Sequence, residues 1–385
     1  MFRISVKTLA HCEALLAEEL RTLGAGDVEM GLRVVHCTGD MAAVYRFNYR
    51  LRTALRVLVQ VTSFRARRPD DLHKKAMEFP WEEMFGIDQT FAIDPNVRSA
   101  QYRHPHFAAL RLKDAIADRF AQRFGSRPDV DPVRPDILLH LHVDEEQVSI
   151  SLDSSGTSLN QRGYRRSGGT APLNEVLAAA MLLHAGYDGS QVLYDPMCGS
   201  GTLSIEAASI ALNRSPQLVR GEFGFMRWPT FDEALWEEIV SESSKENRPL
   251  RAPILPSDVD HKQLALAVEN IAAAGLQDIL RPVLADFMTL EPTHSEGWLI
   301  LNPPYGERMD QDQAEHLYRR IGERFKHHWP GFRAWVISSH TEALKAIGLK
   351  PFRKQELFNG KLSCRFQGYE LYAGSRKGRS SSPEP

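Results

Sequence analysis

Two kinds of hydrophobic pattern follow one another through the first 153 residues. In one, apolar and polar residues alternate; in the other, apolar residues recur with helical spacing. Side chains repeat with period 2 in a strand and 3.6 in a helix, so these patterns predict strands and helices respectively. Strands are expected at 2–7, 31–37, 55–61, 90–97, 137–143 and 147–152, and helices at 11–23, 41–50, 70–85 and 107–124. This order predicts two small α+β units, at 1–64 and 65–153.

The pattern changes after a polar segment at 154–170, which is expected to be a linker. Helices then alternate with apolar strands, which is typical of a parallel sheet covered by helices. Strands are expected at 192–194, 254–256, 281–284, 298–301, 334–338 and 368–373, the last antiparallel, and helices from about 172, at 203–211 and at 262–274. The sequence therefore predicts an α/β domain over 171–374 and a flexible Ser-, Pro- and Arg-rich tail at 375–385.

The composition is that of an ordinary globular protein. Of the 385 residues, 43% are hydrophobic and 25% are charged, and the net charge of -2 excludes a globally basic nucleic-acid binder. The four cysteines form no C-x-x-C pair, which disfavours zinc and disulfides, so no metal is expected. Because the chain shows neither a signal peptide's apolar stretch nor the ~20 apolar residues of a membrane span, we expect a cytoplasmic protein.

A glycine-containing loop joins the strand at 192–194 to the helix at 203–211. In this position open α/β sheets bind nucleotide-like ligands, and glycines let the backbone approach the ligand. The glycine patterns for nucleoside triphosphates and dinucleotides are absent, so these ligands are disfavoured. The alternative is a glycine pair that only shapes a loop. The candidate ligand-binding residues in this loop are Asp195, Pro196, Cys198, Gly199, Ser200, Gly201 and Thr202.

Aspartates also follow the next two predicted strands of the α/β domain. A carboxylate at Asp258 can accept hydrogen bonds from both hydroxyls of a ribose, and Asp286, next to Phe287, can accept one from an adenine amine. The alternatives are a helix N-cap for Asp258 and a turn residue for Asp286. In a parallel sheet the ends of these strands meet at one edge, so Asp195, Asp258 and Asp286 are expected to converge.

The tetrapeptide Asn302-Pro303-Pro304-Tyr305 follows a fourth apolar strand, beside the expected cofactor. An exocyclic amine of a nucleic-acid base is a poor nucleophile, because its lone pair is delocalised into the ring. The Asn302 side-chain oxygen and the Pro303 carbonyl would hold this amine and favour its lone-pair-forward form, while Tyr305 would stack on the base. The motif therefore predicts methyl transfer to a base amine; the alternative is a rigid proline-rich strand exit.

Basic residues occur before the α/β domain in two places. Arg98 and Arg103 lie in the second α+β unit, where a solvated basic surface is the alternative to RNA contact. Arg162, Arg165 and Arg166 lie in the expected linker and are better candidates for phosphate contact, with structural salt bridges as the alternative.

Several longer stretches add a resemblance to these separate motifs. They are Ser151-Leu-Asp-Ser-Ser-Gly-Thr-Ser-Leu-Asn-Gln-Arg-Gly-Tyr-Arg165, Ala171-Pro-Leu-Asn-Glu175, Asp195-Pro-Met-Cys-Gly-Ser-Gly-Thr-Leu203, Phe223-Gly-Phe225 with Trp228, and Asn302-Pro-Pro-Tyr-Gly-Glu-Arg308. Together they resemble the THUMP-domain class I RNA methyltransferases, in particular the bacterial enzymes that make N2-methylguanosine in 23S rRNA. The resemblance covers nearly the whole chain, including the long insertion before Asp258.

The resemblance implies a ferredoxin-like unit, a THUMP RNA-binding domain and a Rossmann-like methyltransferase domain that uses S-adenosylmethionine. In that family the residues that match Asp195, Gly199 and Gly201 shape the cofactor loop, and those that match Asp258, Asp286 and Asn302 to Tyr305 hold the ribose, the adenine and the guanine amine. Thr170 and Pro172 would lie near the methionine moiety. Structured RNA, either 23S rRNA or its assembly precursor, is the expected partner. Because the family also contains longer two-enzyme fusions, this shorter chain is expected to make a single modification.

Alternatives to N2-methylation of guanosine in 23S rRNA remain at this point. The motif equally fits a tRNA guanine or an adenine N6 amine, and a DNA adenine methyltransferase is disfavoured only by the RNA-binding resemblance. A protein of another class, an RNA-binding ribosome assembly factor, is disfavoured by the intact Asn302, Asp258 and Gly201.

Overall fold

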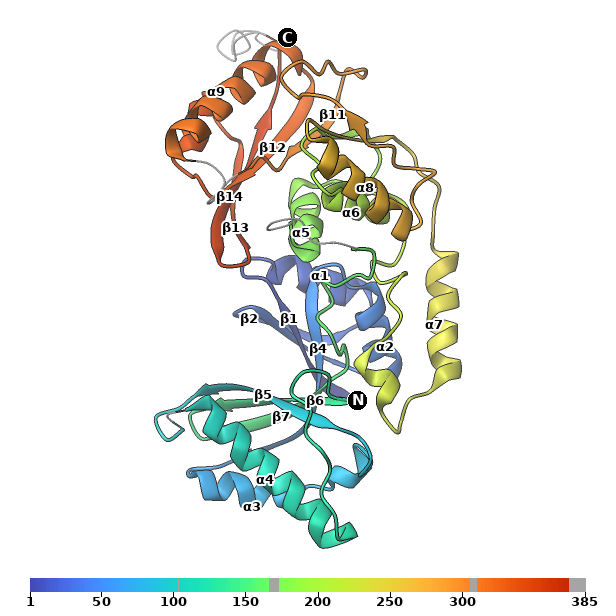
Figure 1. The fold of residues 1–385 in the computed structure, drawn as a ribbon, viewed down its shortest axis with the longest axis vertical. Helices are drawn as coiled ribbons and strands as arrows, with labels where there is room; N and C mark the ends of the chain where they lie inside the picture. Colours follow the sequence, from blue (N-terminus) through green and yellow to red (C-terminus); the bar gives the residue numbers. More distant parts are fainter. Residues whose placement is uncertain (103, 166–172, 305–309, 374–385) are drawn as a thin grey trace, which may run out of the picture. The chain divides into compact units, whose positions relative to one another are not determined.

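The computed structural model describes residues 1–385 except 103, 166–172, 305–309 and 374–385 (Figure 1). The described residues form two compact units. The first contains Met1–Thr8, Leu16–Leu159 and Gly221–Glu242, and the second contains the rest of the described chain. The expected flexible tail at 375–385 lies outside the described residues.

The first unit is built on a seven-stranded sheet with the order β2-β3-β1-β4-β7-β6-β5. The long strand β4 pairs with β1 on one side and with β7 on the other, so the two predicted α+β units share one sheet. Its elements are β1 (Phe2–Thr8), α1 (Glu13–Thr22), β2 (Gly26–Gly31), β3 (Val34–Gly39), α2 (Met41–Arg50), β4 (Ala54–Arg65), α3 (Pro69–Glu78), β5 (Phe91–Arg98), α4 (Pro105–Phe124), β6 (Ile137–Asp144) and β7 (Gln147–Asp153).

Two local predictions for this unit were wrong. The helix expected at 70–85 ends at Glu78, because Pro80 follows and a proline cannot continue the hydrogen-bonding pattern of a helix. A short 3-10 helix, η1 (Trp81–Glu83), takes its place. The strand expected at 31–37 is a hairpin of β2 and β3, and β2 escaped notice because its side chains are mostly exposed and polar.

The sheet of the first unit is strongly curled. On a flat sheet β1 and β5 would lie about 19 Å apart, since neighbouring strands are spaced about 4.8 Å. Lys7 of β1 nevertheless approaches the Asp94 carboxylate of β5 to 3.9 Å. Register shifts between Lys7 and Thr8 and between Gln60 and Thr62 contribute to the bend, since bulges kink a strand and increase its twist.

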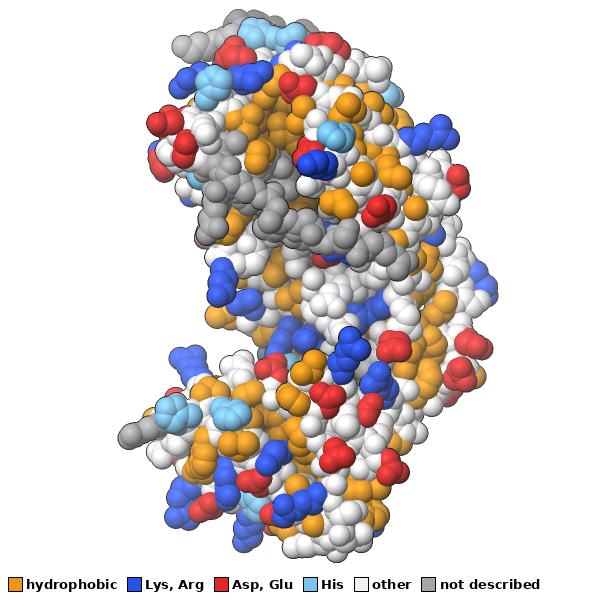
Figure 2. Space-filling view, in the orientation of Figure 1, with side chains coloured by type: hydrophobic (Ala, Val, Ile, Leu, Met, Phe, Trp, Pro, Cys, Tyr) orange, Lys and Arg blue, Asp and Glu red, His pale blue; other side chains and the backbone are white. Residues whose placement is uncertain are grey.

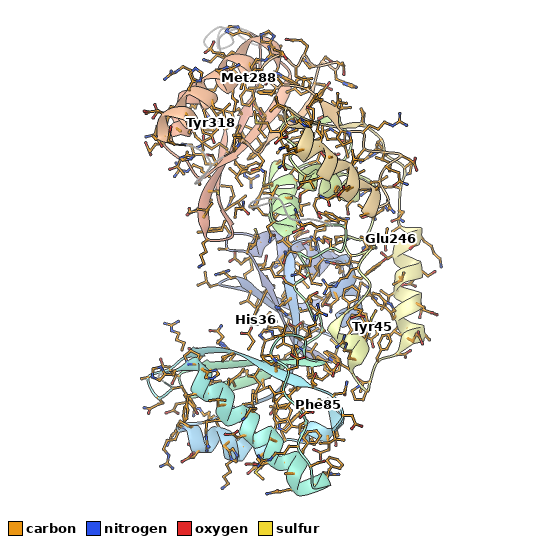
Figure 3. The ribbon with its side chains drawn as sticks, viewed as in Figure 1. His36, Tyr45, Phe85, Glu246, Met288 and Tyr318 are labelled. Carbon is orange, nitrogen blue, oxygen red and sulfur yellow. The ribbon has the colours of Figure 1, made fainter. Side chains whose placement is uncertain are left out.

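A segment from the middle of the chain completes the core of the first unit. Phe225, in η2 (Gly224–Arg227), stacks on Tyr45 of α2 with ring centroids 4.4 Å apart, and Trp236 of α7 (Glu233–Lys245) contacts Tyr45 edge to face. Tyr45 is labelled in Figure 3. The boundary expected from the sequence assigned all of 171–374 to the α/β domain. The aromatic residues of this segment explain its position, because they pack into the same hydrophobic core as the residues of α2.

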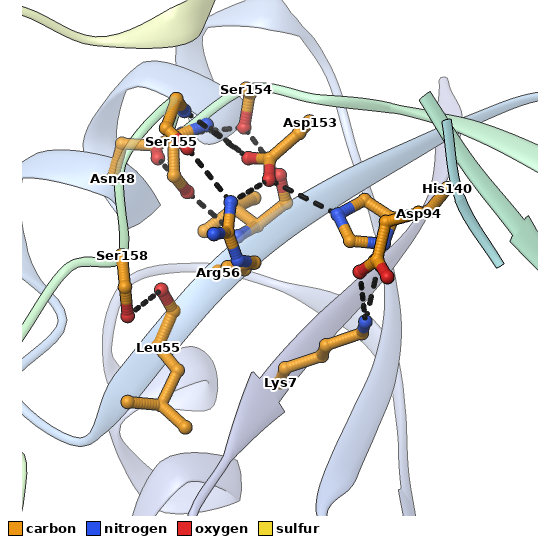
Figure 4. Close-up of polar contacts among 12 residues, drawn as sticks. Lys7, Asn48, Leu55, Arg56, Asp94, His140, Asp153, Ser154, Ser155 and Ser158 are labelled. Atoms are coloured by element: carbon orange, nitrogen blue, oxygen red, sulfur yellow. Dashed lines mark hydrogen bonds and ion pairs between the residues drawn. The ribbon is translucent and has the colours of Figure 1, made fainter. Parts of the chain in front are cut away.

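The start of the expected linker is also buried in the first unit (Figure 4). Ser154 donates a hydrogen bond to the Val57 carbonyl at 2.7 Å, and Ser155 donates one to the Asn48 side-chain oxygen at 2.7 Å. Both serines are fully buried. Residues up to Leu159 therefore belong to the first unit and do not form a linker.

The second unit contains another seven-stranded sheet, with the order β10-β9-β8-β11-β12-β14-β13. Strands β8 to β12 pair in parallel, and β14 runs antiparallel to both neighbours, which confirms the predicted sheet type. The strands are β8 (Leu193–Asp195), β9 (Ile254–Asp258), β10 (Val283–Leu284), β11 (Gly297–Leu301), β12 (Phe332–Ser338), β13 (Arg353–Asn359) and β14 (Leu362–Glu370). The helices are α5 (Glu175–Ala185), α6 (Thr202–Ala211), α8 (His261–Ala273), α9 (Gln311–His328) and the 3-10 helix η4 (Ala343–Ile347).

The order of the strands determines which strand ends lie next to one another in the second unit. Strand β11 is completely buried in the middle of the sheet, between β8 and β12. Because parallel strands end at the same edge, the residues that follow β8, β9, β10 and β11 gather at that edge. Among the described helices, none is long and apolar enough to cross a membrane.

Candidate active site

A cavity of about 540 Å³ lies at the edge where β8, β9, β10 and β11 end. This volume is in the range of small-molecule sites, roughly 300–1,000 Å³. In Figure 2 the second unit shows a hollow with largely hydrophobic walls and with acidic and basic side chains on its rim. Among the lining residues are Leu173, Asp195, Pro196, Met197, Cys198, Gly199, Ser200, Thr202, Leu203, Asp258, Val259, Asp260, Gln263, Asp286, Phe287, Met288, Asn302, Pro303, Pro304, Leu317, Arg320, Asn359 and Leu362.

The loop after β8 is held against the neighbouring elements by its backbone. The Gly199 N–H donates to the Asp258 carboxylate at 2.8 Å, and the Ser200 carbonyl accepts a hydrogen bond from Asn270 of α8 at 3.0 Å. Gly199 and Gly201 have φ values of 54° and 82°, which favour glycine. A Cβ at Gly201 would lie 3.3 Å from the Ala267 Cβ, so this glycine, which does not line the cavity, permits close packing against α8.

Asp195 is fully buried at the end of β8, and only one of its carboxylate oxygens has a partner. Oδ2 accepts a hydrogen bond from Ser204 at 2.7 Å, whereas Oδ1 has no donor among the described residues. Burial raises the pKa of the Asp195 carboxyl to about 7, and the nearby charge of Asp258 contributes to the rise. A buried acceptor without a partner costs about 1–3 kcal/mol, so the site favours a ligand that supplies a donor or a positive charge.

Asp258 and Asp286 line the same cavity but differ in their hydrogen bonds. Asp258 accepts from the Gly199 and Asp260 backbone N–H groups, while Asp260, whose side chain accepts from Lys262 N, is the N-cap of α8. The N-cap alternative for Asp258 is therefore wrong. The exposed Asp286 carboxylate accepts from Met288 N, so it forms a turn and still borders the cavity, as does the buried Phe287.

Asn302 directly follows β11 and contributes a second buried acceptor without a partner. No donor among the described residues reaches its Oδ1. Pro303, which is buried, and Pro304, which is exposed, continue the wall of the cavity. Prolines cannot donate a backbone hydrogen bond and restrict the residue before them, so the segment is a rigid frame with acceptors only.

The structure thus brings most of the predicted cofactor and catalytic residues around one cavity. Thr170, Pro172 and Tyr305 lie outside the described residues. Sequence analysis did not single out the apolar walls from Met197, Leu203 and Met288, nor the contributions of α9 and of the β13–β14 turn. Of these residues, Figure 3 labels Met288. The apolar residues carry no distinguishing sequence signal, because they resemble ordinary core positions.

The predicted RNA-contacting arginines have different surroundings. Arg162 is only 1% exposed and pairs with Glu206 at 3.4 Å, so the prediction that it contacts RNA was wrong. Arg165 donates hydrogen bonds to Glu175, the Leu173 carbonyl and the Thr202 hydroxyl. Arg165, like Arg162, thus forms a structural salt bridge, which was the alternative to RNA contact. Arg98 is exposed in the first unit, and Arg103 and Arg166 lie outside the described residues.

Among the described residues, neither a reactive thiol nor a metal-binding cluster is found. Burial raises the pKa of the Cys198 thiol, so the thiol stays protonated and is not a nucleophile at neutral pH. Among the described residues there is no cluster of three or more potential metal ligands.

Family models match the chain in three consecutive parts. An RlmL ferredoxin-like domain matches residues 3–58, a THUMP domain matches 66–153, and an RMKL-like methyltransferase domain matches 162–367. The chain belongs to the RMKL-like methyltransferase family. The predicted fold, with ferredoxin-like and THUMP domains before a class I methyltransferase domain, and the resemblance stated above are confirmed.

Relatives of this RMKL-like chain carry ribosomal or RNA methyltransferase names. The ribosomal RNA large subunit methyltransferase K/L of Syntrophotalea carbinolica is 40% identical over 372 residues, which are 93% of this chain and 52% of that protein. A candidate RNA methyltransferase of Synechocystis sp., slr0064, is 38% identical over 94% of each chain. The chain thus spans about half the length of the K/L relative but nearly all of slr0064.

A solved structure shows the same arrangement of elements. SMU.472, described as a methyltransferase and solved in complex with SAH, superposes with a TM-score of 0.86 at 27% identity, over 97% of this chain and 98% of that one.

Proposed function

We propose that this chain transfers a methyl group from S-adenosylmethionine to the exocyclic N2 amine of a guanosine in 23S rRNA. The observation that carries the proposal is the pair of buried acceptors without partners, Asp195 Oδ1 and Asn302 Oδ1, in one cavity of a class I methyltransferase fold. Asp195 Oδ1 would accept from the amino group of the cofactor, and Asn302 Oδ1 would accept from the target amine of the base.

The residues of the cavity fit S-adenosylmethionine. Asp195 offers its free oxygen to the cationic amino group of the methionine part, which would also favour the ionised carboxylate. We assign the Asp258 carboxylate to the ribose hydroxyls and Asp286, next to Phe287, to the adenine amine; all three residues line the cavity. Pro196, Cys198, Gly199, Ser200 and Thr202 form the loop around the nucleoside, and Gly201 lets this loop pack on α8. When bound, the cofactor supplies an electrophilic methyl group on a sulfonium.

The Asn302-Pro303-Pro304 segment acts on the other reactant. Asn302 Oδ1 accepts one hydrogen of the target amine and the Pro303 carbonyl accepts the other, which favours a pyramidal nitrogen with its lone pair toward the methyl group. Tyr305 is proposed to stack on the base. No strong general base is needed, because the methylated ammonium product is acidic and loses its proton readily.

RNA as the substrate is supported by two findings. The first unit contains a THUMP domain, and the K/L relative is named for the large subunit of ribosomal RNA. We propose that Arg98, Arg103 and Arg166 contribute to RNA contact. Guanine N2 is favoured by the sequence resemblance, while the Asn302 acceptor alone fits an adenine N6 amine equally well.

The test is to incubate the purified chain with labelled S-adenosylmethionine and unmodified large-subunit rRNA, tRNA or duplex DNA, and to analyse the nucleosides. We expect label in N2-methylguanosine from the rRNA only. Label in N6-methyladenosine, or in tRNA or DNA at a higher rate, would overturn the stated substrate. If none of the nucleic acids is labelled, the proposal as a whole is wrong.

A further inference from the structure

The cavity in the second unit has two sides that come from different parts of the sheet. Strand β11 lies in the middle, with β8, β9 and β10 on one side of it and β12, β14 and β13 on the other. The residues that fit the cofactor follow β8, β9 and β10. The opposite wall comes from α9, which contributes Leu317 and Arg320, and from the turn between β13 and β14, which contributes Asn359 and Leu362.

The two sides also differ in charge. Four of the lining residues are aspartates, and all of them belong to the β8, β9 and β10 side: Asp195, Asp258, Asp260 and Asp286. Arg320 is the one cation among the described lining residues, and it belongs to the α9 side. The acidic side suits a positively charged nucleoside, whereas the α9 side suits an anion.

The other cations of α9 show that Arg320 is not part of the helix's own ion pairing. Farther along the helix, Arg324 pairs with Glu291 at 3.0 Å and Lys326 pairs with Glu323 at 2.9 Å. Arg320 and its neighbour Arg319 are exposed, and neither forms an ion pair with a described residue. Of these two free cations, Arg320 alone lines the cavity.

We propose that the α9 side of the cavity binds the RNA strand that presents the target base, and that Arg320 binds a backbone phosphate next to the target nucleotide. This proposal rests on the proposed function and extends it to a specific subsite. A guanidinium suits this role, because its planar donors match two phosphate oxygens at once. Leu362, 44% exposed at the β13–β14 turn, adds apolar surface for the nucleoside on the same side.

The position of this subsite has a physical reason. A base inside a stack cannot reach a buried acceptor such as Asn302 Oδ1, so the nucleotide must be turned out of the strand. Turning out costs a few kcal/mol, and a cation that holds the adjacent phosphate keeps the nucleotide in the geometry that the reaction needs. On the acidic side of the cavity the same phosphate would be repelled.

The test compares Arg320→Gln with Arg319→Gln, which removes another exposed charge one position away on the same helix. Steady-state methylation of large-subunit rRNA gives kcat and KM, and filter binding at several salt concentrations gives the RNA affinity. We expect Arg320→Gln to raise the KM for RNA roughly tenfold, with kcat less affected, because a charge-assisted contact is lost. The slope of log affinity against log salt should decrease by about 0.7–0.9, as for one phosphate contact. Arg319→Gln should change neither quantity.

A third variant and a second ligand make the result specific. Arg320→Lys keeps the charge without the paired donors, so the salt slope should return while the KM stays raised. The S-adenosylmethionine affinity of Arg320→Gln, measured by calorimetry, should equal that of the wild type. The subsite proposal is overturned if Arg320→Gln behaves like Arg319→Gln, or if it weakens cofactor binding and leaves RNA binding unchanged. Failure of the wild type to methylate RNA would instead refute the proposed function, and the salt-dependent RNA binding would still test Arg320.

Discussion

Two aspartates that end strands in different units, Asp153 in β7 and Asp195 in β8, are both fully buried but have opposite surroundings. Asp153 Oδ2 accepts from Arg56 and from His140 Nε2, and Oδ1 accepts from the Ser155 and Gly156 N–H groups (Figure 4). Although burial acts in the other direction, these bonds and charges lower the pKa of the Asp153 carboxyl. Asp195 has one hydroxyl partner, and its pKa is raised.

The difference separates a structural carboxylate from one that is proposed to bind a ligand. Strands of the curled sheet bring Lys7, Arg56, Asp94 and His140 around Asp153. Each charged side chain of this cluster therefore has an oppositely charged partner within the cluster. In the second unit the cost of burying Asp195 is only partly offset within the described chain, by the hydrogen bond from Ser204. A protein keeps such a group when a ligand compensates it, which is why the unpartnered oxygen supports the proposed cofactor site.

The largest expected effect is on folding stability in the first unit. Asp153→Asn removes the negative partner of the partly buried Arg56 and the buried His140, and loss of one member of a buried ion pair typically costs about 3–5 kcal/mol. Urea unfolding should show this loss for the signal of the first unit. The matched change Asp195→Asn should leave the free energy of unfolding at pH 7 unchanged or raise it. If the two variants lose stability equally, the contrast between the two carboxylates is wrong.

The next effect concerns Asn302, the other buried acceptor without a partner. Asn302→Ala should lower kcat by about 10²–10³-fold, by analogy with the removal of one preorganised hydrogen-bonding group from an active site. Cofactor and RNA affinities should stay within about threefold, because the acceptor acts on the target amine. Asn302→Asp keeps the acceptors and should retain more activity than the alanine variant. Full activity of Asn302→Ala would remove Asn302 from the mechanism.

A smaller effect is expected on cofactor binding at the acidic side of the cavity. Asp195→Asn should raise the Kd for S-adenosylmethionine about 10- to 100-fold, as expected for a charge-assisted hydrogen bond of about 1.5–3 kcal/mol. The control is Asp260→Asn, which removes a charge from the same cavity but keeps an N-cap side chain, since asparagine caps as well as aspartate. Equal effects of the two variants would show that only the overall negative charge matters.

The sequence predicted the sheet of the second unit well because its apolar strands alternate with helices and end in recognisable polar motifs. It missed α9, whose buried positions Ala314, Tyr318, Ile321 and Phe325 have helical spacing but stand among many charged residues. It also missed β13, whose residues are mostly exposed. Such elements depend on contacts with distant residues, which local patterns do not contain.

The candidate site was only partly predictable for the same reason. Aspartates at strand ends and the Asn302-Pro303-Pro304 segment are local signals, and the structure places them around one cavity. The burial of Arg162 beside Glu206 and the position of Arg320 depend on tertiary packing, and an arginine in a sequence does not reveal whether its partner is a glutamate or a phosphate. The membership of 221–242 in the first unit was likewise invisible, because its aromatic residues carry no sign of their partner.

The last expected effect is a pH dependence of folding stability that has opposite sign for the two aspartates. Asp195 keeps its proton in the folded state up to a pKa of about 7, whereas the unfolded chain loses it near the ordinary aspartate pKa of 3.8. The folded state therefore binds more protons between these values, and the free energy of unfolding decreases as the pH rises from about 4 to 7, by at most about 1.4 kcal/mol per pH unit. Asp153, whose pKa is lowered, stabilises the fold above the ordinary aspartate pKa of 3.8 and loses this contribution as the pH falls through its folded pKa. Urea unfolding at pH 5, 6, 7 and 8 should show the advantage of Asp195→Asn over the wild type growing up to pH 7 and then levelling. The penalty of Asp153→Asn should decrease as the pH rises through the raised pKa of His140, because the positive charge that Asp153 stabilises is lost there. A penalty that grows with pH would mean that Asp153, too, is protonated near neutral pH.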